Sequence, residues 1–177
     1  MQVTISANGK NIKAEISEEQ AKIFGLVEDK PKTGYESLGT GETYYLVDVD
    51  DEITTMKYDS RLDRDCYDVG NYYSDKVIAE NNARADRLLR QLRQWQALND
   101  KPISVEDWNN ESKKKWFIIY SYSSEEMYAE YYYIMRLPNT IYFATKEKAE
   151  EAIKVFEDEL LWYFTEYVQR LDEMQND

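Results

Sequence analysis

The chain has 177 residues, 42% hydrophobic and 14% aromatic, which is enough for one domain with a core, with or without a small appendage. It carries 22 basic and 35 acidic residues, a net charge of −13, and no histidine. The lack of histidine excludes Ser-His-Asp and Cys-His triads and the usual Cys/His zinc sites, and no glycine-rich phosphate loop occurs. We therefore expect a binding protein and not an enzyme.

Residues 1–27 predict a small ββα piece. Apolar and polar side chains alternate in residues 2–6 and 11–16, as in two half-buried strands. Asn8-Gly9 lies between them and is the strongest short-range signal of a hairpin turn. A piece of this size cannot hold a core by itself.

A short helix should follow this hairpin over residues 18–24. Ser17 and Gln20 have the spacing of a capping box at its start, and Gly25 provides a stop at its end. Residues 28–41 are rich in proline, glycine and polar side chains, which predicts a linker before the main domain over 42–177.

The first half of the main domain, residues 42–100, predicts a ββ(β)α unit. Its first two runs are rich in Tyr, Val, Ile and Thr and predict an antiparallel hairpin. Next we expect a charged loop, a third strand and a long helix that Ser74 or Asp75 caps. The apolar residues of this helix fall on one face. The expected ranges are 43–49 and 52–58 for the hairpin, 61–68 for the loop, 69–73 for the third strand and 75–99 for the helix.

The second half, residues 113–177, predicts the same order of elements after a break marked by Pro102 and Asn109-Asn110. Thr145 caps the last helix, whose apolar stripe continues for about 29 residues, or about 43 Å at 1.5 Å per residue. Such a helix is long for a domain of this size, and its end could project or pack against another chain. The expected strands are 116–122, 127–135 and 140–143.

A sequence repeat links the two halves. The segment 72–80, Tyr-Tyr-Ser-Asp-Lys-x-x-Ala-Glu, recurs at 142–150 as Tyr-Phe-Ala-Thr-Lys-x-x-Ala-Glu. Convergence of common pieces is the alternative, but the matched spacing favours one supersecondary unit used twice. We expect an α+β fold in which both hairpins share one antiparallel sheet, with the two long helices on one face.

Several features bear on location and cofactors. No apolar run approaches the roughly 20 residues of a membrane span, and no signal peptide is visible. The lone Cys66 fits a reducing cytosol, and the acids around it make it a poor nucleophile. The acids at 48–51 resemble the start of a calcium loop, but Ile53 and Asp59 stand where Gly and Glu are needed. We therefore expect no metal and no cofactor.

Two sets of residues are candidates for partner binding. Acids crowd residues 42–68, and tyrosines crowd 120–133, where strand alternation must expose some of the rings. Together they could present carboxylates beside rings and compete, as a nucleic-acid mimic, for a basic groove. The alternative is that the acids keep the chain soluble and the tyrosines fill half-buried strand positions. The candidate residues are Asp48, Asp50, Asp51, Glu52, Asp63, Asp65, Tyr120, Tyr122, Tyr128, Tyr131, Tyr132 and Tyr133.

Basic residues form an island on the first long helix. They are Arg84, Arg87, Arg90 and Arg93, whose spacing of three winds around the helix. A solvated face paired with acids is one interpretation, and a nucleic-acid backbone contact is the other. A second basic spot is residues 113–115, three consecutive lysines.

Motifs in both units resemble small acidic accessory proteins encoded by phages and prophages of Gram-positive bacteria, a group that includes anti-CRISPR inhibitors of Cas9. The resemblance covers roughly residues 43–155, and its motifs are structural ones. They are Tyr44-Tyr45-Leu46-Val47-Asp48 through Tyr58-Asp59, Tyr67-x-Val69-Gly70-Asn71-Tyr72-Tyr73-Ser74, Trp108-Asn109 through Lys115-Trp116-Phe117-Ile118-Ile119-Tyr120, and Asn139-Thr140-Ile141-Tyr142-Phe143-Ala144-Thr145-Lys146.

The resemblance implies a viral anti-defence protein of the host cytoplasm, with Cas9 and its guide RNA as partner and DNA loading or cleavage as the blocked step. Two alternatives stay open from the residues themselves. One is an interaction or assembly protein without a defence role, dimeric through the last helix. The other is a nucleic-acid-binding protein that uses the arginine helix, or a Mg²⁺-dependent nuclease that uses Asp48, Asp50 and Asp51.

Overall fold

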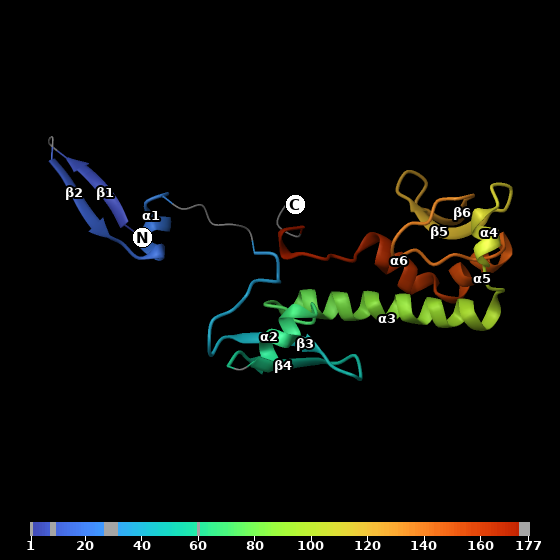
Figure 1. The fold of residues 1–177 in the computed structure, drawn as a ribbon, viewed down its shortest axis with the longest axis horizontal. Coiled ribbons are helices and arrows are strands. Elements are labelled where there is room, and N and C mark those ends of the chain that lie inside the picture. Colours follow the sequence, from blue (N-terminus) through green and yellow to red (C-terminus); the bar gives the residue numbers. More distant parts are fainter. Residues whose placement is uncertain (1, 8–9, 27–31, 60, 174–177) are drawn as a thin grey trace.

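The protein has an α+β fold, as the sequence predicts, in a computed structural model that describes residues 2–7, 10–26, 32–59 and 61–173 (Figure 1). The elements in chain order are β1 (Gln2–Ala7), β2 (Lys10–Glu15), α1 (Glu18–Ile23), β3 (Thr43–Val47), β4 (Ile53–Lys57), α2 (Arg61–Asp68), α3 (Lys76–Asn99), α4 (Val105–Asn109), β5 (Lys115–Ser121), β6 (Glu126–Tyr132), α5 (Lys146–Val155), α6 (Glu157–Thr165) and the 3-10 helix η1 (Leu171–Glu173). None of the described helices has the length and apolar character needed to cross a bilayer.

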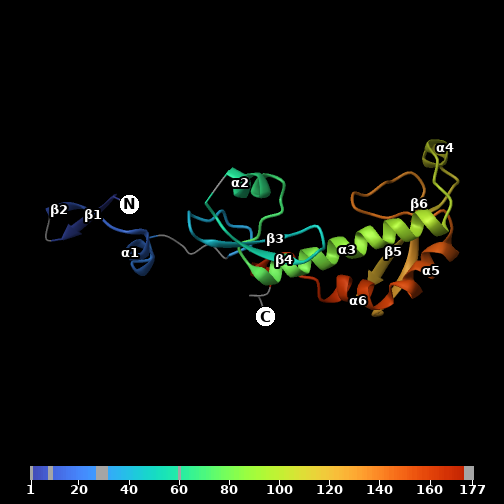
Figure 2. The same cartoon turned by 90° about the horizontal axis from the view of Figure 1, so that it is seen from below.

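The N-terminal piece forms as predicted. β1 pairs antiparallel with β2, although the turn residues 8–9 lie outside the described residues. The hydroxyl of Ser17 accepts a hydrogen bond from the backbone N–H of Gln20 at 3.1 Å, and the Gln20 side chain accepts one from the N–H of Ser17 at 3.0 Å. This capping box starts α1, and Gly25 ends it with a φ of 65°. Both views show the piece set apart from the rest of the chain (Figures 1 and 2).

The repeated segment adopts the same local structure twice. Tyr73 pairs with Tyr45 of β3, and Phe143 pairs with Trp116 of β5, each through two backbone hydrogen bonds. These single bridges replace the third strands expected at 69–73 and 140–143, because the caps of α3 and α5 follow almost at once. The capping residues are Asp75 and Thr145, and the repeat alanines Ala79 and Ala149 are fully buried.

The shared sheet expected for the two hairpins is not formed. Within the described residues, the strands make three separate two-stranded sheets. The outer edges of β3 and β5 are partly occupied by Tyr73 and Phe143, so these two edges do not pair the hairpins with each other. The β3–β4 hairpin packs against α3, whereas the β5–β6 hairpin packs against α5, and α3 runs between the two hairpins (Figure 1).

The core is accordingly divided along α3. Its C-terminal half contributes Leu88 and Leu92 to a cluster with Phe143, α5 and α6. Its N-terminal half contributes Ile78 and Ala79 to a second cluster with Tyr73. The end of α3 at Asn99 agrees with the sequence prediction.

The charged loop expected over 61–68 is the helix α2, and the prediction was wrong there. The prediction relied on the high charge of this segment and did not identify its buried position. Asp63 occupies that position, and its carboxylate is held by the rest of the first unit, as shown below.

The single long C-terminal helix is also not formed. It breaks at Phe156, whose ψ of 24° separates α5 from α6 and whose ring packs against the core, and α6 ends at Thr165. The chain then returns toward the first unit, and the N–H of Leu171 bonds the carbonyl of Thr33, in the segment before that unit, at 3.0 Å. The projecting helix on which the dimer alternative depended is therefore absent from the described chain.

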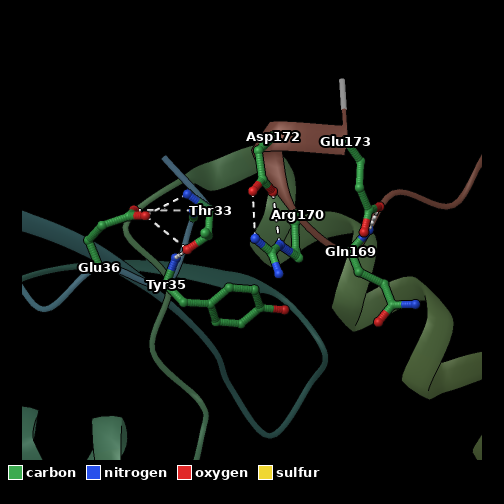
Figure 3. A network of polar contacts seen from close by, with 8 residues as sticks. Thr33, Tyr35, Glu36, Gln169, Arg170, Asp172 and Glu173 are labelled. Carbon is green, nitrogen blue, oxygen red and sulfur yellow. Dashed lines mark hydrogen bonds and ion pairs between the residues drawn. The ribbon is translucent and has the colours of Figure 1, made fainter. Parts of the chain in front are cut away.

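Part of the expected linker belongs to the main body. The carboxylate of Glu36 accepts hydrogen bonds from Thr33, Gly34 and, at 2.6 Å, from the hydroxyl of Ser74 at the start of α3. Burial raises the pKa of Glu36, but these hydrogen bonds outweigh it and lower the pKa to about 2. Figure 3 shows Thr33 and Glu36 beside the returning C-terminal segment, where Arg170 pairs with Asp172.

Candidate interaction surfaces

The candidate acids separate into engaged and free carboxylates. Asp63 is only 2% exposed. Its two carboxylate oxygens accept hydrogen bonds from the Tyr44 hydroxyl at 2.6 Å and from the Asp59 backbone N–H at 2.8 Å. The sequence interpretation of Asp63 as a partner-binding surface acid is therefore wrong. Burial raises the pKa of Tyr44, and the hydrogen bond and charge of Asp63 raise it further.

Two acids of the β3–β4 turn are also engaged. Asp48 accepts hydrogen bonds from the backbone N–H groups of Asp50 and Glu52 and from the Thr54 hydroxyl, and the bond from Asp50 is the main cause of its lowered pKa. Asp51 forms an ion pair with Arg90 of α3. The carboxylates at 48–51 thus do not converge, and the described residues include no group of three metal-ligating side chains that could hold a metal ion.

Asp50, Glu52 and Asp65 are exposed, and within the described chain they have no ion-pair partner. Exposed apolar side chains occur in the same segments: Val49 is 98% exposed and Val69 is 78% exposed, and Leu62 and Tyr67 of α2 also face solvent. We name this set the acidic face, consisting of Val49, Asp50, Glu52, Leu62, Asp65, Tyr67 and Val69. The exposed valines were missed by sequence reasoning, because a valine beside turn acids carries no signal of exposure.

The two parts of the acidic face are held next to each other. The side chain of Asn71 bonds both backbone groups of Val47, at 2.8 and 2.7 Å, and so fixes the segment after α2 against the end of β3. Val69 and Asp51 consequently line one small polar cavity of about 270 Å³. The turn and the segment after α2 thus lie side by side.

The candidate tyrosines do not join this surface. They lie on β5–β6 and its ends, beside the C-terminal half of α3, whereas the acidic face lies on the first unit (Figure 1). The expected arrangement of those carboxylates beside those rings is therefore not formed. Tyr67 is the ring that lies among the candidate acids.

Half of the candidate tyrosines are packed. Tyr120 stacks on Phe164 of α6 with centroids 5.9 Å apart, and Tyr131 packs on Trp116 at 4.8 Å. Tyr132 packs on Phe117, also with partial burial. The exposed rings are Tyr122, Tyr128 and Tyr133.

The arginine island is partly neutralised within the molecule. Arg84 bonds Glu159 of α6 at 2.9 Å and lies over the Trp162 ring, and its hydrogen bond is the main reason that the pKa of Glu159 is lowered. Arg90 pairs with Asp51. Arg87 and Arg93 are exposed and have no ion pair in the described part of the chain. Four arginines therefore do not form one continuous basic stripe.

The three consecutive lysines have three different environments. Lys113 pairs with Asp107 at 2.7 Å, and the ammonium group of Lys114 lies 4.1 Å from the Tyr131 ring centroid. Lys115 is fully buried and donates to the backbone carbonyls of Asn110 and Tyr133. Three consecutive lysines in the sequence do not indicate that the third of them is buried.

No protein-family model matches this chain, and no curated protein or solved structure matches it either.

Proposed function

We propose that this chain is a non-catalytic binding protein whose acidic face occupies a positively charged surface of a macromolecular partner. The observation that carries the proposal is the acidic face itself. It offers three exposed carboxylates without ion-pair partners in the described chain, Asp50, Glu52 and Asp65, in segments that also carry exposed apolar side chains.

The combination of the two kinds of side chain supports binding more than charge does alone. Exposed acids by themselves are explained by solubility. A fully exposed Val49 at a turn and an exposed Val69 beside it contribute nothing to the core, and each would gain from burial at about 25 cal/mol per Å². Apolar contacts supply affinity, while the surrounding carboxylates supply orientation and fast association with a basic partner.

For the partner we propose Cas9 with its guide RNA, in the cytoplasm of the bacterial host. The motif resemblance to phage accessory proteins supports this choice, and Cas9 holds its nucleic acids in a positively charged channel. An acidic face that enters this channel would block DNA loading or cleavage as an anti-CRISPR.

The experiment is co-purification with the Cas9–guide complex, followed by a DNA cleavage assay in the presence of the protein. The variant Asp50→Lys with Glu52→Lys reverses two charges of the acidic face and should lower affinity about tenfold at low salt, because two favourable contacts become repulsive. The loss should be smaller at high salt, where exposed charges are screened.

The matched control is Glu111→Lys with Glu125→Lys, which changes the net charge equally at exposed positions outside the first unit. If both double variants lose affinity equally, net charge and not the acidic face is responsible. If cleavage is unchanged at an excess of the protein, Cas9 is not the partner. In that case, a pull-down from host lysate with the same two variants tests the acidic face alone.

A further inference from the structure

A second, chemically opposite surface lies at the end of the molecule where α3 ends. It is an open groove of about 320 Å³ between the last turns of α3, the segment leading into α4 and the loop after β6. This volume is at the lower end of the range for small-molecule sites, so it accommodates one small ligand or one unit of a larger one. The lining residues important here are Arg93, Gln96, Trp108, Arg136, Thr140 and Tyr142.

The groove is cationic in a strongly anionic chain. Among the described residues, none that lines it is acidic, although the chain has 35 acids against 22 bases. Arg93 and Arg136 are exposed and have no carboxylate partner in the described chain. Two acids close to the groove in sequence are engaged elsewhere: Asp107 pairs with Lys113, and Asp100 accepts the backbone N–H of Ala144 at 2.7 Å.

The aromatic wall of the groove is held in place. Trp108 packs edge-on against Tyr142 with centroids 4.9 Å apart. Tyr142 is itself buried, and its hydroxyl accepts the backbone N–H of Leu137 at 2.9 Å. The guanidinium of Arg136 lies 5.2 Å from the Trp108 ring centroid. The groove thus combines a positioned indole with two guanidinium groups that have no carboxylate partner in the described chain.

We propose that this groove binds a nucleotide unit. The guanidinium groups of Arg93 and Arg136 hold the phosphate, because planar forks of N–H donors match phosphate oxygens. The base packs against Trp108, as bases do on aromatic platforms of single-strand-binding proteins. Gln96 and Thr140 offer hydrogen bonds to the sugar or the base edge.

Arg93 is the member of the arginine island that lines this groove, whereas Arg84 and Arg90 are neutralised within the fold. A phosphate beside a base occurs both in a free mononucleotide and in single-stranded nucleic acid, so either one could be the ligand that the groove binds. The proposal is independent of the acidic face, since no residue of that face lines the groove.

The test uses the purified full chain alone. Binding of AMP and UMP is measured by calorimetry, and binding of a fluorescent single-stranded oligonucleotide by anisotropy. Arg93→Ala and Arg136→Ala should each weaken binding about tenfold to hundredfold, the range for a hydrogen bond to a charged group. Trp108→Leu should weaken it by about tenfold through the lost stacking. Arg87→Ala is the matched control, since it removes an exposed arginine of the same helix outside the groove, and it should leave affinity unchanged.

Tighter binding of the mononucleotides identifies a free nucleotide as the ligand, and binding of the oligonucleotide alone identifies a strand. The proposal is overturned if neither binds, or if Arg87→Ala weakens binding as much as Arg93→Ala. It is also overturned if inorganic phosphate or a poly-glutamate peptide competes as well as the nucleotide does, since the nucleotide base would then contribute nothing to binding. Arg136 is exposed on a loop, so its variant tests the groove even if Trp108→Leu does not fold.

Discussion

The buried pair of Tyr44 and Asp63 should contribute a large part of the stability of the first unit. Tyr44 is 1% exposed and donates to Asp63, which also accepts the N–H of Asp59. Hydrogen bonds to a charged group contribute about 1.5–3 kcal/mol each, so Asp63→Ala should lower the free energy of unfolding by about 3–6 kcal/mol. That is a large fraction of the roughly 5–15 kcal/mol of a typical domain.

The matched control is Asp65→Ala, two residues further along α2. It makes the same chemical change at an exposed position and should alter the free energy of unfolding by no more than about 0.5 kcal/mol. A double-mutant cycle of Asp63→Ala with Tyr44→Phe should give a coupling energy of about 1.5–3 kcal/mol. Urea unfolding followed by circular dichroism measures all four proteins. Equal midpoints for the two aspartate variants, or additive single effects in the cycle, would refute the assigned role of the pair.

The same pair predicts a loss of stability at high pH. Burial and the Asp63 carboxylate raise the pKa of Tyr44 above its ordinary value of 10.0, so the folded state favours the protonated phenol. A raised pKa contributes stability that is complete below pH 10 and is lost as the pH rises above it. The stability difference between the wild type and Tyr44→Phe should therefore shrink above pH 10. A difference that grows with pH would contradict this sign.

Two further changes test how residues 33–36 are joined to the main body. Glu36→Gln should lower the free energy of unfolding by about 1–2 kcal/mol at pH 7, a value reduced for partial exposure from the shift between 4.5 and about 2. Because a lowered pKa stabilises only the ionised form, the difference from wild type should disappear as the pH falls from about 4.5 to 2; a difference constant across these pH values would refute it. Gly34→Ala should lower the free energy of unfolding by about 2–4 kcal/mol, because φ is +91° and the new Cβ would lie 2.7 Å from Ile78. Gly41→Ala also has a positive φ but meets nothing within 4 Å, so a loss as large as that of Gly34→Ala would show that contact with Ile78 is irrelevant.

Short-range patterns predicted the elements whose stabilising contacts are themselves short-range. The capping box of Ser17, the caps Asp75 and Thr145, and the end of α3 at Asn99 all involve residues within one helical turn. The repeat also predicted that 72–80 and 142–150 fold alike, and both segments bridge a strand and start a helix. Such features need only neighbouring residues in the chain, which is why the sequence contains them.

Elements that depend on distant partners were predicted poorly. α2 was expected as a loop because its buried residue, Asp63, is held by Tyr44, which lies 19 positions away. The break at Phe156 is invisible in a continuous apolar stripe, since it depends on how that ring packs in the core. The burial of Lys115 likewise depends on the carbonyl of Tyr133, which follows the partner strand β6 of its hairpin.

By itself, the sequence determined the composition, the net charge, the repeated unit and the positions of most strands and helices, because these follow from residue identity and local periodicity. The tertiary structure decided which charges reach solvent. It buried Asp63, paired Asp51 with Arg90, left Asp50 exposed on the acidic face, and joined Arg93 and Arg136 in one groove. The physical reason is that burial and ion pairing depend on distances between residues far apart in the chain, and only the folded arrangement of the elements sets those distances.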